Sequence, residues 1–238
     1  MRITRVVSLA TLTLLLCGSA CTQLGELQVE SRSIELTDVE SVMAEIRMGA
    51  GELRVSGGAA QLLEADFAYN VADWKPEVDY RVICDRGRLT VRQPSGTGST
   101  LGGARYEWDL RLNDDVPLEL SVVLGAGRAD LILGSLSLTY LDIKTGAGET
   151  ILDLTGDWKT DLSANIKGGV GRTTVRLPRD VGVRVDAKAG IGRINATGLK
   201  RDGGAYVNDA YGESDVTLRI DIKGGVGEIN LELGSPAL

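Results

Sequence analysis

The sequence of 238 residues contains no histidine, and this absence narrows the chemistry open to the protein. Histidine is the only side chain whose unperturbed pKa lies near neutrality, and it is the commonest metal ligand. The residues that are present show no pattern typical of a catalytic, metal-binding or cofactor-binding site. The sequence therefore favours a non-enzymatic protein that uses no metal and no cofactor.

Positive charge and aromatic side chains are also scarce. There are 26 Lys and Arg residues against 33 Asp and Glu residues, which gives a net charge of -7, and aromatic residues make up only 4% of the chain. An acidic surface repels a phosphate backbone, so the composition argues against a nucleic acid partner. The apolar fraction of 43% is enough to build a core in one or two domains without metals or disulfides.

The sequence has no apolar run long enough to cross a membrane as a helix, which takes roughly 20 residues. Its most apolar stretch, residues 6–16, follows Arg2 and Arg5 and precedes small residues. This pattern predicts a signal peptide over residues 1–20 and an extracytoplasmic location. The segment 16–21, Leu-Cys-Gly-Ser-Ala-Cys, resembles a bacterial lipobox, which implies a lipid anchor on Cys21. Plain secretion is the alternative, because Gly18 stands where lipoproteins usually carry leucine.

Cysteine is rare, with three residues in the chain. If Cys17 leaves with the leader and Cys21 is acylated, Cys84 has no partner for a disulfide. It follows an alternating apolar pattern, so we expect it to be a buried core residue. Residues 21–40 are rich in polar side chains and poor in apolar ones, and we expect them to form a tether.

Glycine, in contrast, is abundant, and 12 of the 31 glycines belong to one repeated motif, Gly-(Ala/Val/Ile)-Gly-(Glu/Arg). The first glycines at 125, 146, 169 and 190 are 21, 23 and 21 residues apart, near the length of one rung of a β-solenoid. We therefore expect residues 119–238 to form a Gly-rich stacked β-repeat (β-solenoid-like) body. The six glycine pairs are Gly49 and Gly51, Gly125 and Gly127, Gly146 and Gly148, Gly169 and Gly171, Gly190 and Gly192, and Gly225 and Gly227.

The apolar alternation changes phase across each motif, which indicates a bend in the strand. A two-residue hairpin is disfavoured, because Val170, Ile191 and Val226 resist the positive φ that such turns need. We expect instead a corner at which glycine supplies unusual dihedral angles and the residue between the glycines stays inside. Successive motifs would then occupy successive rungs. The last interval is longer, and we assign the excess to a turn-rich loop at residues 199–214.

Charged residues recur at outward positions of the repeat. Two residues before the motif, four rungs carry lysine, and acidic residues or asparagine lie two residues earlier. Two interpretations stay open: a docking strip for an anionic envelope polymer, or a solvated face neutralised by its own acids. A second column mixes both signs. The lysines are Lys144, Lys167, Lys188 and Lys223, and the mixed column contains Arg128, Glu149, Arg172, Arg193 and Glu228.

Residues 41–118 differ from the repeat and show strand patterns at 63–71, 78–84, 88–93 and 106–112. We expect an N-terminal β-meander subdomain here, which makes the whole protein all-β. Trp108 is predicted to lie in the core. Trp74 is either an exposed ligand anchor or a ring folded over its own turn, and for Trp158 packing and sugar stacking both stay open.

Several of these segments resemble a known family. Residues 49–53 (Gly-Ala-Gly-Glu-Leu), 57–59 and 62–65, followed by residues 108–113 and 116–118, are similar to the N-terminal part of bacterial toast-rack proteins. The later repeats resemble those of LiaF-like cell-envelope stress proteins and adhesin-like β-repeat domains. The resemblance implies an all-β body in the cell envelope, and it supplies no catalytic residues.

These observations lead to one expected role and two alternatives. We expect a protein anchored on the cell surface or in the periplasm or outer membrane, acting as a non-enzymatic binding or structural module of adhesin-like type. Its expected partners are the membrane, through the anchor, and an envelope polymer or a membrane protein. The first alternative is a LiaF-like stress regulator acting on a membrane sensor. The second is a hydrolase that uses Asp114 and Asp115.

Overall fold

The computed structural model describes residues 24–94 and 103–234, and the predicted signal peptide and Cys21 lie outside them. In these two ranges the protein is all-β, with one short 3-10 helix, η1 (Ala72–Trp74), and no α-helix. All thirteen strands belong to one sheet. The predicted fold class is confirmed.

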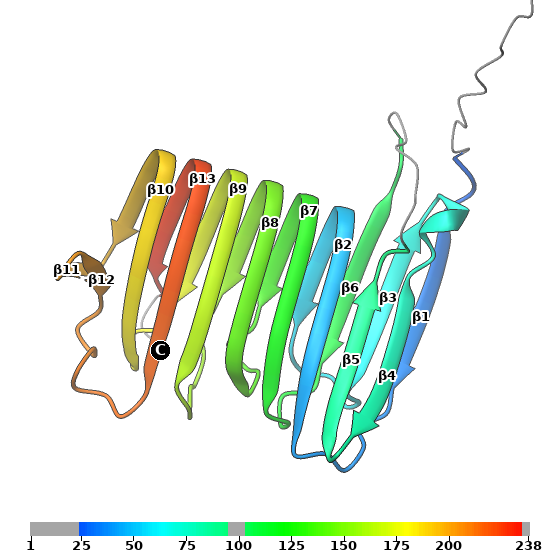
Figure 1. The fold of residues 1–238 in the computed structure, drawn as a ribbon, viewed down its shortest axis with the longest axis horizontal. Helices are drawn as coiled ribbons and strands as arrows, with labels where there is room; N and C mark the ends of the chain where they lie inside the picture. Colours follow the sequence, from blue (N-terminus) through cyan, green and yellow to red (C-terminus); the bar gives the residue numbers. More distant parts are fainter. Residues whose placement is uncertain (1–23, 95–102, 235–238) are drawn as a thin grey trace, which may run out of the picture.

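Six long strands form the body of the molecule, and we call them rungs. Each rung contains one glycine motif and bends there, at the corner (Figure 1). The halves before the corners form one layer, the halves after them form the other, and neighbouring rungs pair in parallel along their length. The rungs are β2 (Ser41–Ser56), β7 (Leu118–Ile132), β8 (Leu138–Asp153), β9 (Leu162–Leu177), β10 (Gly182–Thr197) and β13 (Thr217–Leu233).

The core lies between the two layers, and the change of apolar phase at the corner explains how it is filled. In β7, Val122 and Leu124 before the corner and Ala129 and Leu131 after it are all buried. A strand that turns around the core must shift its alternation to keep facing inward on both sides. The predicted corner is therefore confirmed, and none of the six motifs forms a hairpin tip.

The prediction that the residue between the two glycines faces the core is wrong. In all six rungs this residue is exposed, and the exposed fraction reaches 72% for Ile191 and 58% for Val170. At the apex of the bend the side chain points away from both layers, so the alternation of the flanking strands does not extend through the corner. The six residues are Ala50, Ala126, Ala147, Val170, Ile191 and Val226.

The two glycines of each motif have different tasks. The second has a positive φ, for example +129° at Gly148, whereas the first does not. The first glycine is needed for close approach: a Cβ on Gly146 would lie 2.2 Å from the carbonyl oxygen of Gly125 on the neighbouring rung. Unusual dihedral angles therefore explain only the second glycine of each motif. Close contact between rungs explains five of the six first glycines, and Gly49 instead faces the side chain of Gln93.

The rungs do not stack in chain order throughout. The spatial order is β2, β7, β8, β9, β13, β10, so that the last rung of the chain lies between β9 and β10 (Figure 1). The prediction that successive motifs occupy successive rungs is thus correct from β2 to β9. It is wrong for β10 and β13, which are exchanged in space. The predicted loop at residues 199–214 contains a small hairpin of β11 (Lys200–Asp202) and β12 (Ala205–Val207), and β12 covers part of the free edge of β10.

The N-terminal strands extend both layers and do not form a simple meander. These strands are β1 (Gln28–Ile34), β3 (Leu63–Tyr69), β4 (Glu77–Ile83), β5 (Arg86–Arg92) and β6 (Tyr106–Leu112). Strand β5 pairs with the first half of β2, and β6 pairs with its second half. Since β2 is bent, its two halves lie in different layers and each needs its own neighbour. After β3, which lies in the layer of the second half, the chain crosses to the other layer to form β4 and β5. Consequently β3 pairs with β1 and β6, and β4 pairs with β5.

Two further predictions need correction. Seven of the twenty residues of the predicted tether, 28–34, form strand β1, which is hydrogen bonded to β3. Cys84 is exposed and not buried, since it lies in the turn between β4 and β5 with a φ of +47°. The alternating pattern that leads into Cys84 belongs to the end of β4, where Val82 and Ile83 are also exposed.

The tryptophans all serve packing. Trp108 is buried as predicted. Trp74 is also buried, with its ring centroid 5.2 Å from that of Tyr106, which agrees with a ring folded inward. Trp158 is buried, and its indole Nε1–H donates to the carbonyl oxygen of Leu154 at 2.8 Å. None of the three is free to stack on a sugar.

Candidate functional site

The acidic pair proposed as a hydrolase site has a structural role. The Asp114 carboxylate accepts hydrogen bonds from the backbone N–H of Gly58 and from the hydroxyl of Ser135, both at 3.0 Å. The backbone N–H of Asp115 is held by the side chain of Asn113 at 2.9 Å. These contacts tie the turn before β7 to the loops of neighbouring strands. Within the described ranges there is also no cluster of three acidic or cysteine side chains that could hold a metal ion.

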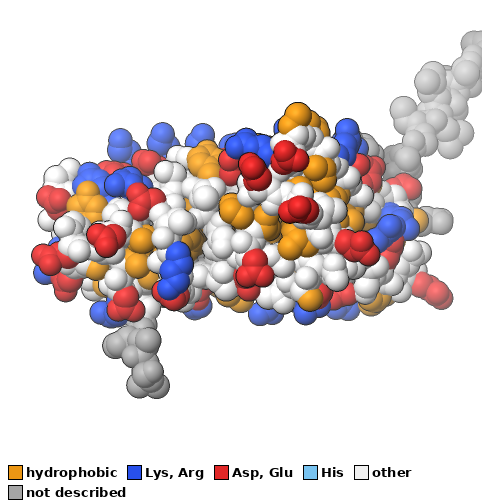
Figure 2. Space-filling model, turned by 90° about the horizontal axis from the view of Figure 1, so that it is seen from below, with side chains coloured by type: hydrophobic (Ala, Val, Ile, Leu, Met, Phe, Trp, Pro, Cys, Tyr) orange, Lys and Arg blue, Asp and Glu red, His pale blue; other side chains and the backbone are white. Residues whose placement is uncertain are grey.

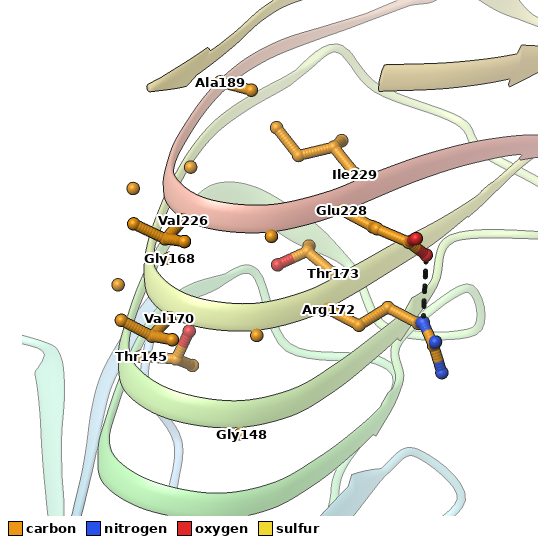
Figure 3. Close-up of a pocket in the computed structure, with 15 residues that line it drawn as sticks. Thr145, Gly148, Gly168, Val170, Arg172, Thr173, Ala189, Val226, Glu228 and Ile229 are labelled. Carbon is orange, nitrogen blue, oxygen red and sulfur yellow. Dashed lines mark hydrogen bonds and ion pairs between the residues drawn. The ribbon is translucent and has the colours of Figure 1, made fainter. Parts of the chain in front are cut away.

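The glycine corners enclose little space. Figure 3 shows the hollow inside the corners of β8, β9, β13 and β10, lined by small residues such as Thr145, Gly168 and Ala189. Its volume is about 20 Å³, which suits about one water molecule. The corners therefore offer no room inside for an organic ligand, and their outer surface is the part available to a partner.

The structure brings the four predicted lysines into one column. In spatial order they are Lys144 on β8, Lys167 on β9, Lys223 on β13 and Lys188 on β10, each at the same register position as the next. Parallel strands lie about 4.8 Å apart, so the column is about 14 Å long. All four side chains are exposed. Figure 2 shows Lys and Arg side chains along both long margins of the molecule.

Only one of these lysines is neutralised by its neighbours. The Lys144 ammonium donates to the Asp142 carboxylate at 2.6 Å, and this hydrogen bond raises the pKa of Lys144. The other three form no ion pair among the described residues. The neighbouring column explains this for two rungs, since β9 has the neutral Asn165 there and Asp186 on β10 pairs with Arg184. On β13 the column carries Asp221, which forms no ion pair with Lys223 among the described residues. We call Lys167, Lys223 and Lys188 the lysine strip.

The mixed-sign column, in contrast, is paired from Arg128 to Arg193, and the unexpected rung order is the reason. In space it reads Glu52, Arg128, Glu149, Arg172, Glu228, Arg193, with strictly alternating charge. Arg128 contacts Glu149 at 2.7 Å, and Arg172 lies 3.6 Å from Glu149 and 3.5 Å from Glu228. A hydrogen bond from Arg193 to Glu228 lowers the pKa of that carboxyl group. In chain order, Arg172 and Arg193 would be neighbours and would repel each other.

This alternation gives a test of the rung order. We expect Glu228→Arg to lower the melting temperature by a few degrees, since three arginines then stand side by side. The double variant Glu228→Arg with Arg193→Glu should recover part of the loss and stay below wild type, because Arg172 still faces an arginine. Thermal unfolding followed by circular dichroism measures both. A double variant more stable than wild type would instead mean that β10 lies next to β9.

The three rungs that carry the lysine strip, β9, β13 and β10, also carry exposed apolar side chains at their corners. Val170 on β9, Val226 on β13 and Ile191 on β10 share one register position, and their exposed fractions are 58%, 45% and 72%. We call them the corner ridge. Figure 3 shows Val170 and Val226 stacked at the bend, with Thr173 and Ile229 further inside. Sequence reasoning missed the ridge, although a signal existed: the corner residue is alanine in the first three rungs and β-branched in the last three.

Two family models match this chain. Residues 23–176 match the model of the N-terminal domain of toast_rack, DUF2154. Residues 133–231 match the C-terminal region of LiaF, described as a cell wall-active antibiotics response protein. Among curated proteins, none matches the chain. In the part of the chain that the structure describes, no helix has the length and apolar character needed to span a membrane.

One solved structure is closely similar. The crystal structure of a proposed cell adhesion protein from Clostridium sporogenes ATCC 15579 has 34% sequence identity and a TM-score of 0.83, covering 88% of this chain and 100% of that one. A proposed adhesin from Bacteroides fragilis NCTC 9343 aligns at 10% identity with a TM-score of 0.31, over 87% of this chain and 97% of its own, and carries no argument.

The family match extends over more than half of the chain, and the Clostridium sporogenes structure aligns with 88% of it at 34% identity. The residues on which the resemblance was based include the glycine corner of β2 at 49–53 and parts of β3 and β6. The chain belongs to the toast-rack family.

Proposed function

We propose that this protein is an exported, non-enzymatic binding module of the cell envelope, of adhesin-like type. The observation that carries the proposal is the 34% identity, over 88% of the chain, to a proposed cell adhesion protein. The fold is consistent with such a role. It presents regular columns of side chains on a rigid surface, and one of these columns consists of charged residues that pair across neighbouring rungs.

We propose further that a lipid on Cys21 holds the body at a membrane. The described chain begins at residue 24, and the backbone N–H of Gly25 already donates to the carbonyl oxygen of Asn70 at 2.7 Å. A residue spans at most about 3.5 Å, so the segment between Cys21 and Gly25 reaches about 14 Å. Because the folded body already holds the chain at Gly25, it would stay close to the membrane surface.

The anchor is tested by fractionating cells that express the full chain. We expect wild-type protein in the membrane fraction, released by detergent and not by salt, and Cys21→Ser in the soluble fraction. Cys84→Ser is the matched control, since Cys84 is exposed on the folded body and should not affect partitioning. Equal membrane association of wild type and Cys21→Ser would count against lipid anchoring at this residue.

A second candidate function is regulation of a membrane sensor in the envelope stress response. It is favoured by the match of residues 133–231 to the LiaF-like C-terminal region. Affinity purification of the full chain from detergent-solubilised membranes separates the two candidates. A membrane sensor protein recovered in stoichiometric amount would support regulation, whereas recovery of envelope polymer or surface material alone would support the binding module.

A further inference from the structure

We propose that the corner ridge and the lysine strip together form a docking surface for an anionic lipid bilayer. Both sets lie on the same three rungs, β9, β13 and β10. In each rung the lysine precedes the corner residue by three positions, so the ammonium groups and the apolar side chains form two parallel rows along the corner. This proposal deepens the proposed function, because it names the surface that the folded body contacts once it is held at the envelope.

The apolar row is the first line of evidence. Isolated exposed apolar side chains are common, but these three are aligned at one register position and project from the outermost part of a rigid bend. The close glycine contacts between rungs fix the backbone beneath them. Insertion into the boundary between headgroups and acyl chains would therefore cost little ordering entropy.

The charged row is the second line of evidence. Lys167, Lys223 and Lys188 have no ion-pair partner among the described residues, although the chain carries an excess of acid. Lysines that are free of internal partners can approach anionic headgroups, and each contributes about 1 kcal/mol near such a surface. The three unpaired lysines lie on the same rungs as the corner ridge, so cationic and apolar side chains are available to one surface.

The first three rungs provide an internal comparison. Their corner residues are Ala50, Ala126 and Ala147, which are too small to insert. Their residues in the lysine column are Arg47, paired with Glu45, the apolar Val123, and Lys144, paired with Asp142. In this column and at the corner, unpaired cations and large apolar side chains therefore appear together in the last three rungs, whereas the first three have alanine corners and only paired cations.

The strand directions place the beginning of β1 at the same edge. The second half of β2 runs away from its corner, β6 is parallel to it, and β1 has the same direction after two antiparallel pairings. The beginning of β1 is thus on the corner side of the molecule, as Figure 1 shows. An anchor at Cys21 would bring the corner edge, and not the opposite edge, towards the membrane.

The apolar row distinguishes a lipid surface from a soluble anionic polymer. A hydrated polyanion would use the lysines alone, and its affinity would not depend on Val170, Val226 or Ile191. A bilayer interface uses both rows, because apolar area and electrostatic attraction add in interfacial binding.

The test uses the body from Thr22 onward, without leader or anchor. It contains every described strand, and a relative that corresponds to 88% of this chain crystallises as such a body. We expect co-sedimentation with vesicles of phosphatidylcholine and phosphatidylglycerol, and none with phosphatidylcholine alone. Changing the three lysines of the strip to Gln should weaken binding on the order of 100-fold. Changing the three ridge residues to Ser should weaken it at least about tenfold.

The matched control changes Arg54, Arg86 and Arg88 to Gln, which removes the same charge from exposed positions away from the strip. We expect it to bind within about threefold of wild type, since long-range attraction is screened beyond about 10 Å in 0.1 M salt. Circular dichroism confirms that all variants fold.

The proposal is overturned if wild type does not bind phosphatidylglycerol vesicles, or if the ridge variant binds them as well as wild type. Binding of soluble polyphosphate without binding of vesicles would likewise overturn it, in favour of a polymer ligand. None of these results depends on whether Cys21 is acylated.

Discussion

Gly148→Ala is expected to lower the free energy of unfolding by about 4 kcal/mol. Gly148 is the second glycine of the β8 corner and has a φ of +129°, a region that side chains with a Cβ strongly avoid. An alanine Cβ at this place would lie 1.9 Å from the carbonyl oxygen of Gly127 on β7. The neighbour is backbone held in a parallel ladder, so it cannot move aside without breaking hydrogen bonds on both sides of the corner. Urea unfolding followed by circular dichroism measures the change.

Gly203→Ala is the matched control for this prediction. Gly203 lies in the turn between β11 and β12, has a φ of +53°, and no atom lies within 4 Å of the place that a Cβ would occupy. The cost should therefore be about 1 kcal/mol, the price of the backbone conformation alone. Similar losses in the two variants would show that close contact between rungs does not hold the corner, contrary to the structure.

The corner was predictable because its signal is local. Val122, Leu124, Ala129 and Leu131 lie within ten residues of each other, and their change of phase permits few backbone paths. The column of lysines was predictable for a related reason, since each rung aligns with the next at its glycine motif. Once the motif fixes the register, any residue at a constant offset must stack.

The order of the rungs was not predictable from apolar pattern. The inward residues of β10 and β13 are both compatible with β9, because Ile166 can face either Ala187 or Ile222 in the core. The discriminating signal was electrostatic: Glu228 fits between Arg172 and Arg193, whereas the two arginines do not fit side by side. Exposed pairs of this kind are individually weak, so such a signal is easily overlooked.

The corner ridge was missed because strand alternation was extended through a position where it fails. Val170 lies four residues after the inward Ile166, and Ile191 lies two residues after Ala189. On a straight strand an even spacing of this kind would place both side chains on the core face. At the apex of a bend the inside has room only for backbone, which is why the hollow beneath the corners is about 20 Å³. Strand β1 was missed for a different reason: at the sheet edge most of its side chains are exposed, so it lacks the apolar periodicity of a strand.

The second large effect concerns Asn208, which follows β12 and is buried with an exposed fraction of 4%. Its Nδ2 donates to the carbonyl oxygens of Val181 at 2.7 Å and of Pro178 at 3.3 Å, and its Oδ1 accepts from the N–H of Val183 at 2.9 Å. Residues 178–181 connect β9 to β10 and must pass the end of β13, a distance of two strand spacings or about 9.6 Å. Asn208 therefore provides hydrogen bonds to the backbone carbonyl groups of the connection from β9 to β10, the connection that passes over β13.

We expect Asn208→Ala to lower the free energy of unfolding by about 3 kcal/mol, because it leaves buried carbonyl and amide groups without partners. Asn195→Ala is the matched control: Asn195 is exposed on β10 and bonds only the side chain of Asn230 at 2.8 Å, so its loss should cost less than about 1 kcal/mol. Amide hydrogen exchange locates the damage. The amides of Val183 and of the first half of β10 should lose protection in Asn208→Ala, while those of β7 and β8 keep it, since each rung is stabilised mainly by its immediate neighbours. Uniform loss of protection in all rungs would show that Asn208 supports the whole sheet and not the crossover that makes room for β13.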